Sequence, residues 1–436
     1  MIRILAALTL SLAALTARAE ITITEVTSPG GIEAWLVEEP SIPFVALEIV
    51  IEGGANLDEP GKRGAVNLMM ALLEEGSGDM DARTFQEARE ELAASFGFDA
   101  YDDSVAISAK YLSETQDDAI GLLRQALVSP TFDEDAVERV RAQVLSILRS
   151  EQTDPNDIAG KAFDALAYGD HPYGSSLNGT PESVGSLTRE DLIAAHGRVL
   201  NRSDVHVAAV GDITAEELGA VIDELLGALP AEAPENPADV AFGLPGGITV
   251  VDFATPQSVA LFGHAGIDRD SEDFFAAYIL NEILGGSGLD SRLMEEVREK
   301  RGLTYGVYSY LVSKEHADSY LGSVASANDR IAEAIAVIQD EWSRMAEEGV
   351  TAEELAEAKT YLTGAYPLRF DGNARIANIL VGMQMQDLSR DYILTRNDRI
   401  NAVTLDEINR VASELLDPDA LHFVVVGQPE GLPATQ

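Results

Sequence analysis

The stretch LTREDL at residues 187–192 decides the fold prediction for this chain, because a similar stretch, VTLDEI, returns at residues 403–408. In both stretches the threonine caps an expected helix, and the two threonines are 216 positions apart. Each expected helix leads to a short apolar strand that ends on glycine, and Gly427 also follows Gly211 by 216 positions. Two pairs of markers at one offset indicate that a domain has been duplicated within the chain.

Other segments of the two halves support this duplication. VAL at residues 45–47 begins one expected strand, and VAL at residues 259–261 begins another. Gly-Ser-Gly follows an expected helix in both halves, at residues 76–78 and 286–288. Between the halves, LPAEAPENP at residues 229–237 has the proline and acid content of an extended linker.

We therefore predict an N-terminal domain over residues 20–229, a linker over 230–245 and a C-terminal domain over 246–436. In the first half, expected strands at 45–51 and 105–109 are interspersed with expected helices at 65–73, 82–92, 115–127 and 133–149. Strands and helices do not alternate one by one. This order predicts an α+β fold made of two homologous α+β sandwich domains, each an antiparallel-rich sheet with helices packed on one face.

The first nineteen residues predict a secretory signal peptide. A short basic start precedes an apolar run over residues 4–15, and TARA at 16–19 offers a small-residue cleavage site. The alternative is an uncleaved anchor. No later stretch is long and apolar enough to span a membrane, so we expect an exported, periplasmic protein without a membrane span after signal cleavage.

The composition excludes several classes of function. The chain contains no cysteine, which rules out thiol nucleophiles and cysteine-based metal sites. Its formal net charge of −44 argues against nucleic-acid binding, which requires a basic face. Such an acidic surface either attracts basic peptides or partners, or is simply a solvated surface suited to a salty environment.

Four motifs resemble, in their order along the chain, the insulinase or pitrilysin-like family of zinc peptidases. They are GGAN with DEPG at residues 53–61, YGDHPYG at 168–174, GTPES at 179–183 and LMEEVREKRGLTY at 293–305. The resemblance covers roughly residues 30–428. It implies a pitrilysin-type pair of α+β domains, a zinc motif H-x-x-E-H on a helix of the first half, and a third carboxylate ligand some 75 residues later.

This chain departs from the family at the zinc motif itself. The slots of H-x-x-E-H hold Asn67, Met70 and Ala71, none of which supplies an imidazole ligand or a carboxylate base. The third ligand is expected near residues 146–148, where there is no carboxylate; Glu151 is the nearest acid beyond them. We predict that this helix keeps its packing role and that the chain itself holds no metal.

The second half matches the family at an arginine and a tyrosine seven residues apart, Arg298 and Tyr305. The resemblance implies that this pair holds a substrate carbonyl and stabilises the oxyanion. We expect Arg298 near the end of a helix over residues 290–300 and Tyr305 at the start of a strand over 305–312. Taken without the resemblance, Arg298 pairs with Glu295 on an exposed helix and Tyr305 is a half-buried strand residue.

The leading hypothesis is a non-metal-binding subunit of a two-chain zinc metallopeptidase that degrades peptides. It implies a heterodimer in which a homologous partner contributes the zinc, its ligands and the base, and in which this chain is inactive alone. Two alternatives stay open. One is a non-catalytic scaffold or peptide-binding protein on a peptidase fold, and the other is an autonomous metallopeptidase with an atypical site.

Overall fold

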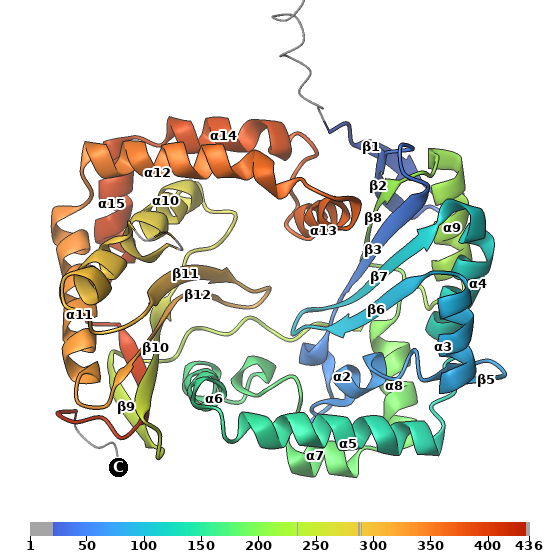
Figure 1. The fold of residues 1–436 in the computed structure, drawn as a ribbon, viewed down its shortest axis with the longest axis horizontal. Coiled ribbons are helices and arrows are strands. Elements are labelled where there is room, and N and C mark those ends of the chain that lie inside the picture. Colours follow the sequence, from blue (N-terminus) through green and yellow to red (C-terminus); the bar gives the residue numbers. More distant parts are fainter. Residues whose placement is uncertain (1–20, 233, 287, 289, 433–436) are drawn as a thin grey trace, which may run out of the picture.

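The computed structural model describes residues 21–232, 234–286, 288 and 290–432. The predicted signal peptide, residues 1–19, lies outside this part of the chain. Two large sheets dominate the architecture, one in each half, and helices surround them (Figure 1).

The first sheet has the strand order β1-β2-β8-β3-β7-β6 and the second has the order β11-β12-β10-β13-β9. The first contains β1 (Thr24–Thr27), β2 (Glu33–Glu38), β3 (Phe44–Glu52), β6 (Ser95–Ala100), β7 (Ser104–Leu112) and β8 (Val205–Gly211). The second contains β9 (Gly247–Asp252), β10 (Gln257–Ala265), β11 (Val307–Ser313), β12 (Asp318–Ala327) and β13 (His422–Gly427). A small ribbon joins β4 (Gly76–Ser77) to β5 (Met80–Asp81).

The two sheets share one topology. Read from β2, the first sheet runs β2-β8-β3-β7-β6, and the second runs β9-β13-β10-β12-β11 in the same sense. The pairs β2–β8 and β9–β13 are parallel, and the other pairs in both sheets are antiparallel. The predicted α+β class with two similar, antiparallel-rich sheets is confirmed.

The repeated stretches at the ends of the halves form the same local structure. Thr188 and Thr404 each close a reciprocal capping box, at the start of α8 (Arg189–Val199) and α15 (Leu405–Leu415). The strands that follow end on Gly211 and Gly427, with φ angles of 146° and 152°. A Cβ atom at either glycine would overlap a neighbouring strand, so the same residue type is required twice.

Each half provides its own helices to one face of its sheet. The first half contributes α2 (Ala65–Met70), α3 (Ala82–Glu91), α4 (Gln116–Val128), α5 (Glu134–Glu151), α7 (Pro181–Ser186), α8 and α9 (Ala215–Leu226). The second contributes α10 (Phe274–Gly285), α11 (Ile331–Glu348), α12 (Ala352–Ala365), α14 (Tyr392–Ala402) and α15. The predicted helices at 82–92, 115–127 and 133–149 match α3, α4 and α5, whereas the helix predicted at 65–73 already ends at Met70.

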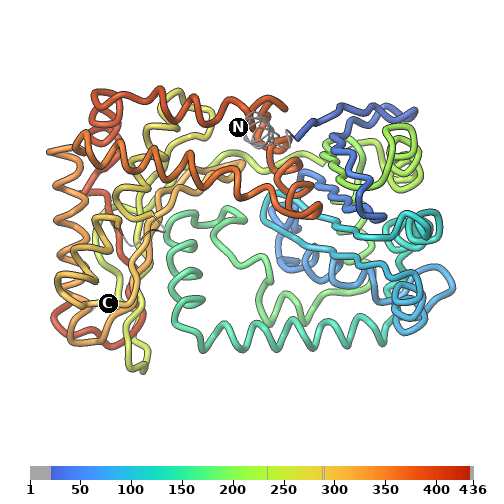
Figure 2. The backbone as a smooth tube through the Cα atoms, turned by 45° about the horizontal axis from the view of Figure 1, so that its top comes forward, coloured from blue at the N-terminus to red at the C-terminus, as the bar shows by residue number. Residues whose placement is uncertain are grey.

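The other face of each sheet is covered by a helix from the opposite half. From the second half, α13 (Asn373–Gln384) packs on β8 and β3, and from the first half, α6 (Pro155–Tyr168) packs on β10 and β13 (Figures 1 and 2). Val50 and Val210 meet Leu380 under α13, while Phe163 meets Val424 under α6. Each half therefore completes the core of the other.

Between α9 and β9 the described residues form neither helix nor strand. The domain boundaries themselves stay a prediction. Within the part of the chain that the structure describes, no helix has both the length and the apolar composition needed to cross a lipid bilayer.

Candidate functional site

The short helix α2, which carries the degenerate zinc slots, is fixed at its start by a buried carboxylate. Asp58 accepts hydrogen bonds from the backbone N–H groups of Gly64 (2.8 Å) and Val66 (2.9 Å). Burial raises the pKa of Asp58 to about 6, although the two backbone hydrogen bonds and Arg63 act in the opposite direction. The carboxylate thus takes the place of an N-cap and holds the preceding loop against the helix.

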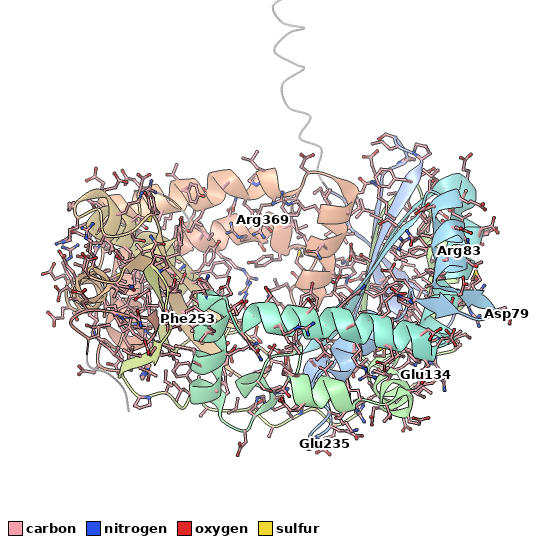
Figure 3. All side chains as sticks on the ribbon, turned by 60° about the horizontal axis from the view of Figure 1, so that its bottom comes forward. Asp79, Arg83, Glu134, Glu235, Phe253 and Arg369 are labelled. Atoms are coloured by element: carbon pink, nitrogen blue, oxygen red, sulfur yellow. The ribbon has the colours of Figure 1, made fainter. Side chains whose placement is uncertain are left out.

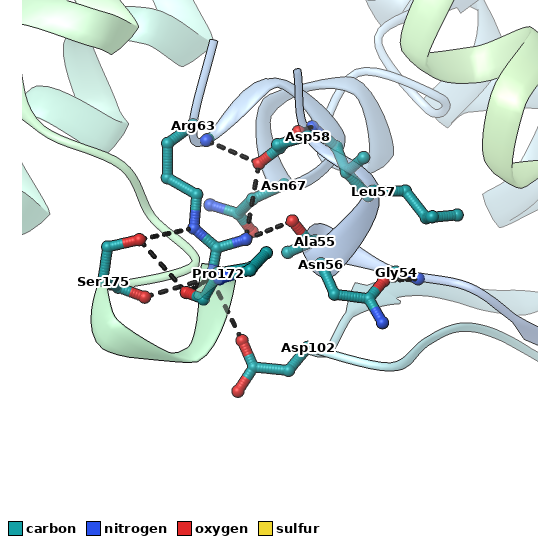
Figure 4. A network of polar contacts seen from close by, with 12 residues as sticks. Gly54, Ala55, Asn56, Leu57, Asp58, Arg63, Asn67, Asp102, Pro172 and Ser175 are labelled. Carbon is teal, nitrogen blue, oxygen red and sulfur yellow. Dashed lines mark hydrogen bonds and ion pairs between the residues drawn. The ribbon is translucent and has the colours of Figure 1, made fainter. Parts of the chain in front are cut away.

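Arg63 ties this loop to two other parts of the chain (Figure 4). Its guanidinium donates to the carbonyl oxygens of Ala55, Pro172 (3.1 Å) and Ser175 (3.0 Å), and forms an ion pair with Asp102 (3.2 Å). The second oxygen of Asp102 binds the Lys314 ammonium of the other half at 2.7 Å. The Arg63 guanidinium, whose side chain is 12% exposed, therefore links the α2 loop, the loop after α6 and, through Asp102, the residue that follows β11 in the second half.

The zinc slots are incorporated into the packing of the protein. Met70 is buried, Ala71 is exposed and carries no ligand atom, and the Asn67 side-chain amide donates to the Asn178 side-chain oxygen at 2.9 Å. Asn178 in turn donates to Glu151 at 2.6 Å. The polar slot of the helix is thus joined by a single asparagine to a carboxylate.

Glu151 sits at the end of α5, and its second oxygen binds the Lys161 ammonium at 2.6 Å. The side chain of Glu151 is only 13% exposed, so the lysine balances a largely buried charge. Glu151 lies one helical turn beyond the segment expected to carry the third ligand, hence on the same helix face. That helical spacing was the sequence signal that could have placed Glu151 near the zinc slots. No sequence signal placed Asn178 or Lys161 there.

These residues do not fit a zinc ion. A zinc site needs several imidazole, thiolate or carboxylate donors that converge on the ion, whereas Glu151 is a single carboxylate bound to Asn178 and Lys161 and Asn67 presents an amide already bonded to Asn178. Among the residues that the structure describes, no group of three or more histidine, aspartate or glutamate side chains is placed to hold a metal ion.

Arg298 and Tyr305 are solvent-accessible, and their local structure differs from the prediction. Arg298 lies in the last turn of the short π-helix η4 (Met294–Glu299), and its Nε is 3.4 Å from Glu299, not paired with Glu295. Tyr305 precedes β11 rather than starting it, and is 88% exposed rather than half-buried. The strand predicted from residue 305 begins at Val307, because Gly306 and the turn before it break the extended conformation.

The segment that carries this pair is itself firmly held. The buried Glu296 pairs with Lys300 (2.7 Å) and Arg301 (2.5 Å), and these hydrogen bonds, that of Lys300 first, lower its pKa to about 2. Next to Tyr305, the Thr304 hydroxyl donates to the Ala325 carbonyl at 2.7 Å. The frame is therefore rigid while the phenol of Tyr305 projects into solvent.

Comparisons with known proteins match both halves of the chain. The model described as Insulinase (Peptidase family M16) matches residues 34–181, and that described as Peptidase M16 inactive domain matches residues 186–362. The chain is 26% identical over 395 residues to a Helicobacter pylori protein named non-peptidase homolog YmxG, covering 89% of this chain and 90% of that protein. It is 28% identical over 397 residues to an uncharacterized zinc protease of Mycobacterium bovis, with 89% and 90% covered.

Solved structures show the same fold. A peptidase M16 inactive domain from Pseudomonas fluorescens superposes with a TM-score of 0.88 at 27% identity, covering 95% of this chain and 99% of that one. A chain of Complex III2 from Candida albicans reaches a TM-score of 0.77 at 14% identity, covering 95% and 97%, and shares the fold. With both halves matched in order and the fold reproduced, this chain belongs to the M16 insulinase family of proteins.

Proposed function

We propose that this chain is the metal-free subunit of a two-chain peptidase of the M16 family, working outside the cytoplasm. The observation that carries the proposal is the contrast between the two sites. Around the zinc slots, hydrogen bonds connect Asn67 to Asn178 and Asn178 to Glu151, and Lys161 pairs with Glu151. By contrast, Arg298 and Tyr305 are accessible to solvent on a segment held by internal pairs.

In this proposal a homologous partner subunit supplies zinc, its ligands and the base. This chain supplies two donors. The Arg298 guanidinium and the Tyr305 hydroxyl donate to the carbonyl oxygen of a bound peptide, and both hydrogen bonds strengthen as negative charge develops on that oxygen. Neither residue needs a change of protonation state for this role, so the chain contributes binding and electrostatic stabilisation only.

The test mixes the purified mature chain with an M16 subunit that carries an intact H-x-x-E-H motif and measures peptide hydrolysis. We expect each chain alone to be inactive and the mixture to be active. Arg298→Ala and Tyr305→Phe are each expected to lower kcat by about 10²-fold to 10³-fold, the usual cost of removing one oxyanion donor. Arg375→Ala and Tyr361→Phe change exposed residues of the same types on α13 and α12 and serve as matched controls.

An unchanged rate for both Arg298→Ala and Tyr305→Phe would refute the assigned roles. A second candidate function is a non-catalytic, peptide-binding or scaffolding protein, which the name of the Helicobacter pylori relative favours. It predicts that the chain binds peptide without a partner and that no mixture hydrolyses it. An autonomous metallopeptidase gains no support from the donors described around α2.

A further inference from the structure

A cavity of about 330 Å³ lies in the second half, where α10, η5 (Tyr366–Arg369), α13 and α14 meet. Its charge is opposite to that of the rest of the protein. The lining residues include Arg269, Arg369 and Arg396 but no aspartate or glutamate, in a chain whose formal net charge is −44. Asp268 and Asp270, beside Arg269 in the sequence, line a neighbouring cavity instead.

Arg396 is the innermost of these cations, with only 5% of its surface exposed. Its guanidinium donates to the Leu362 carbonyl (3.2 Å), to the Asn397 side chain (3.1 Å) and to the Tyr278 hydroxyl (3.3 Å), and lies 4.2 Å from the centre of the Tyr366 ring. These partners are all neutral. Within the described residues Arg396 has no carboxylate partner, so its positive charge is desolvated and uncompensated.

Arg269, which also lines the cavity, repeats this arrangement. Its guanidinium donates to the Tyr392 hydroxyl at 3.0 Å and stacks 4.1 Å from the centre of the Phe274 ring. Because Tyr278 and Tyr392 accept hydrogen bonds from arginines through their oxygens, their own O–H groups remain to donate to something else. Arg369, exposed at the turn after α12 and labelled in Figure 3, adds a third guanidinium.

We infer that this cavity is a binding site for the carboxylate of a peptide. The planar guanidinium forks match a carboxylate, the two phenols add neutral donors, and the rings of Phe274, Phe275 and Tyr366 provide an apolar wall for the adjoining side chain. An acidic protein repels carboxylates elsewhere on its surface, which leaves this cavity as the favoured place for one. That the carboxylate belongs to a peptide rests on the proposed function.

The test is calorimetric titration of the isolated mature chain with acetylated tetrapeptides of three alanines and a phenylalanine. One has a free C-terminal carboxylate and one is amidated. A third is amidated and has glutamate as its second residue, to separate a side-chain carboxylate from a terminal one. We expect at least one of the two peptides that carry a carboxylate to bind. The amidated peptide without glutamate should bind at least tenfold more weakly. Arg269→Gln and Arg369→Ala should each weaken carboxylate binding about tenfold or more, and Arg375→Ala should leave it unchanged.

Arg396 is left intact in this design because its burial makes a folding defect the expected result of its replacement. The inference is overturned if neither carboxylate peptide binds more tightly than the amidated peptide without glutamate, or if neither substitution weakens the binding of a carboxylate peptide. Tighter binding of inorganic phosphate than of the free-acid peptide overturns the assignment to a carboxylate. Failure here leaves the partner-dependent hydrolysis test intact, because that test depends on Arg298 and Tyr305, and neither lines this cavity.

Discussion

The loop and helix around α2 differ from the segment between η4 and β11 in how their polar side chains are satisfied. Around α2, the side chains of Asp58, Arg63 and Asn67 are all engaged by partners within the chain. In the segment from η4 to β11, Tyr305 is 88% exposed and the Arg298 guanidinium pairs with an exposed glutamate. A buried polar group must find an internal partner, whereas an exposed one is solvated by water until a ligand arrives. Burial and internal pairing thus mark a site with a structural role, and an exposed donor on a rigid frame marks one that is available.

Among the substitutions that test this comparison, Arg63→Ala is expected to change the free energy of unfolding most. The substitution removes the hydrogen bonds to three carbonyl groups and the ion pairs with Asp58 and Asp102, of which Asp102 keeps Lys314 and Asp58 loses its paired guanidinium. We expect the free energy of unfolding to fall by about 3 kcal/mol, measured by urea denaturation. Arg83→Ala is the matched control, because Arg83 is 81% exposed and should change stability by less than about 0.5 kcal/mol. Equal effects of the two substitutions would contradict the structural role of Arg63.

Lys161→Met should have the next largest effect. It keeps the aliphatic part of the side chain but leaves the Glu151 carboxylate, 13% exposed, without its cation. Because Lys161 itself is 36% exposed and water can reach it, we expect a loss of about 2 kcal/mol rather than the full cost of a buried unpaired charge. Adding Glu151→Gln should recover part of that loss. Strictly additive losses in the double-mutant cycle would show that the pair is not coupled.

Glu48 extends the comparison to carboxyl groups, because it is buried on β3 and its pKa is raised to about 7 by burial first and by Asp99 second. Its pKa is above the unfolded value, so the folded protein takes up a proton as the pH falls through about 7 and the unfolded chain does not. Stability should therefore rise, by about 1 kcal/mol, from pH 7.5 to pH 5.5. Glu48→Gln should reduce this rise in urea-denaturation midpoints. An undiminished rise in the variant would assign the effect to other groups.

The smallest effects are expected for Arg298→Ala and Tyr305→Phe. Since Tyr305 is 88% exposed and the Arg298 side chain, 36% exposed, pairs with an exposed glutamate, each substitution should change the free energy of unfolding by less than about 0.5 kcal/mol. Thermal melting checks this directly. A large loss of stability would show that these residues are structural after all, and would remove the contrast with α2.

Much of the fold could be predicted because its signals are local. The capping residues Thr188 and Thr404 and the terminal glycines of β8 and β13 act on their immediate neighbours, so their repetition exposed the duplication directly. The prediction for the strand at Tyr305 was wrong by two residues, because an aromatic residue after a turn has the composition of a strand without its pairing.

For the candidate site, too, some features could be predicted from the sequence and others could not. Asn67, Met70 and Ala71 could be identified as non-ligands because ligand chemistry belongs to each residue type. What occupies the site instead depends on α5, α6 and the loop at Asn178, which approach α2 only after folding. The arginines of the second-half cavity likewise come from separate elements, Arg269 before α10 and Arg396 on α14.

By itself, then, the sequence determined the repeat, the α+β class and the loss of the zinc ligands, since these depend on residue types and on spacing along the chain. Only the tertiary structure decided that α6 and α13 each pack on the sheet of the opposite half and that Lys161 pairs with Glu151 near Asn67. It also decided that three arginines line one cavity whose lining contains no aspartate or glutamate. The physical reason is that such pairings join segments far apart in sequence, and their partners are chosen by packing rather than by any neighbouring residue.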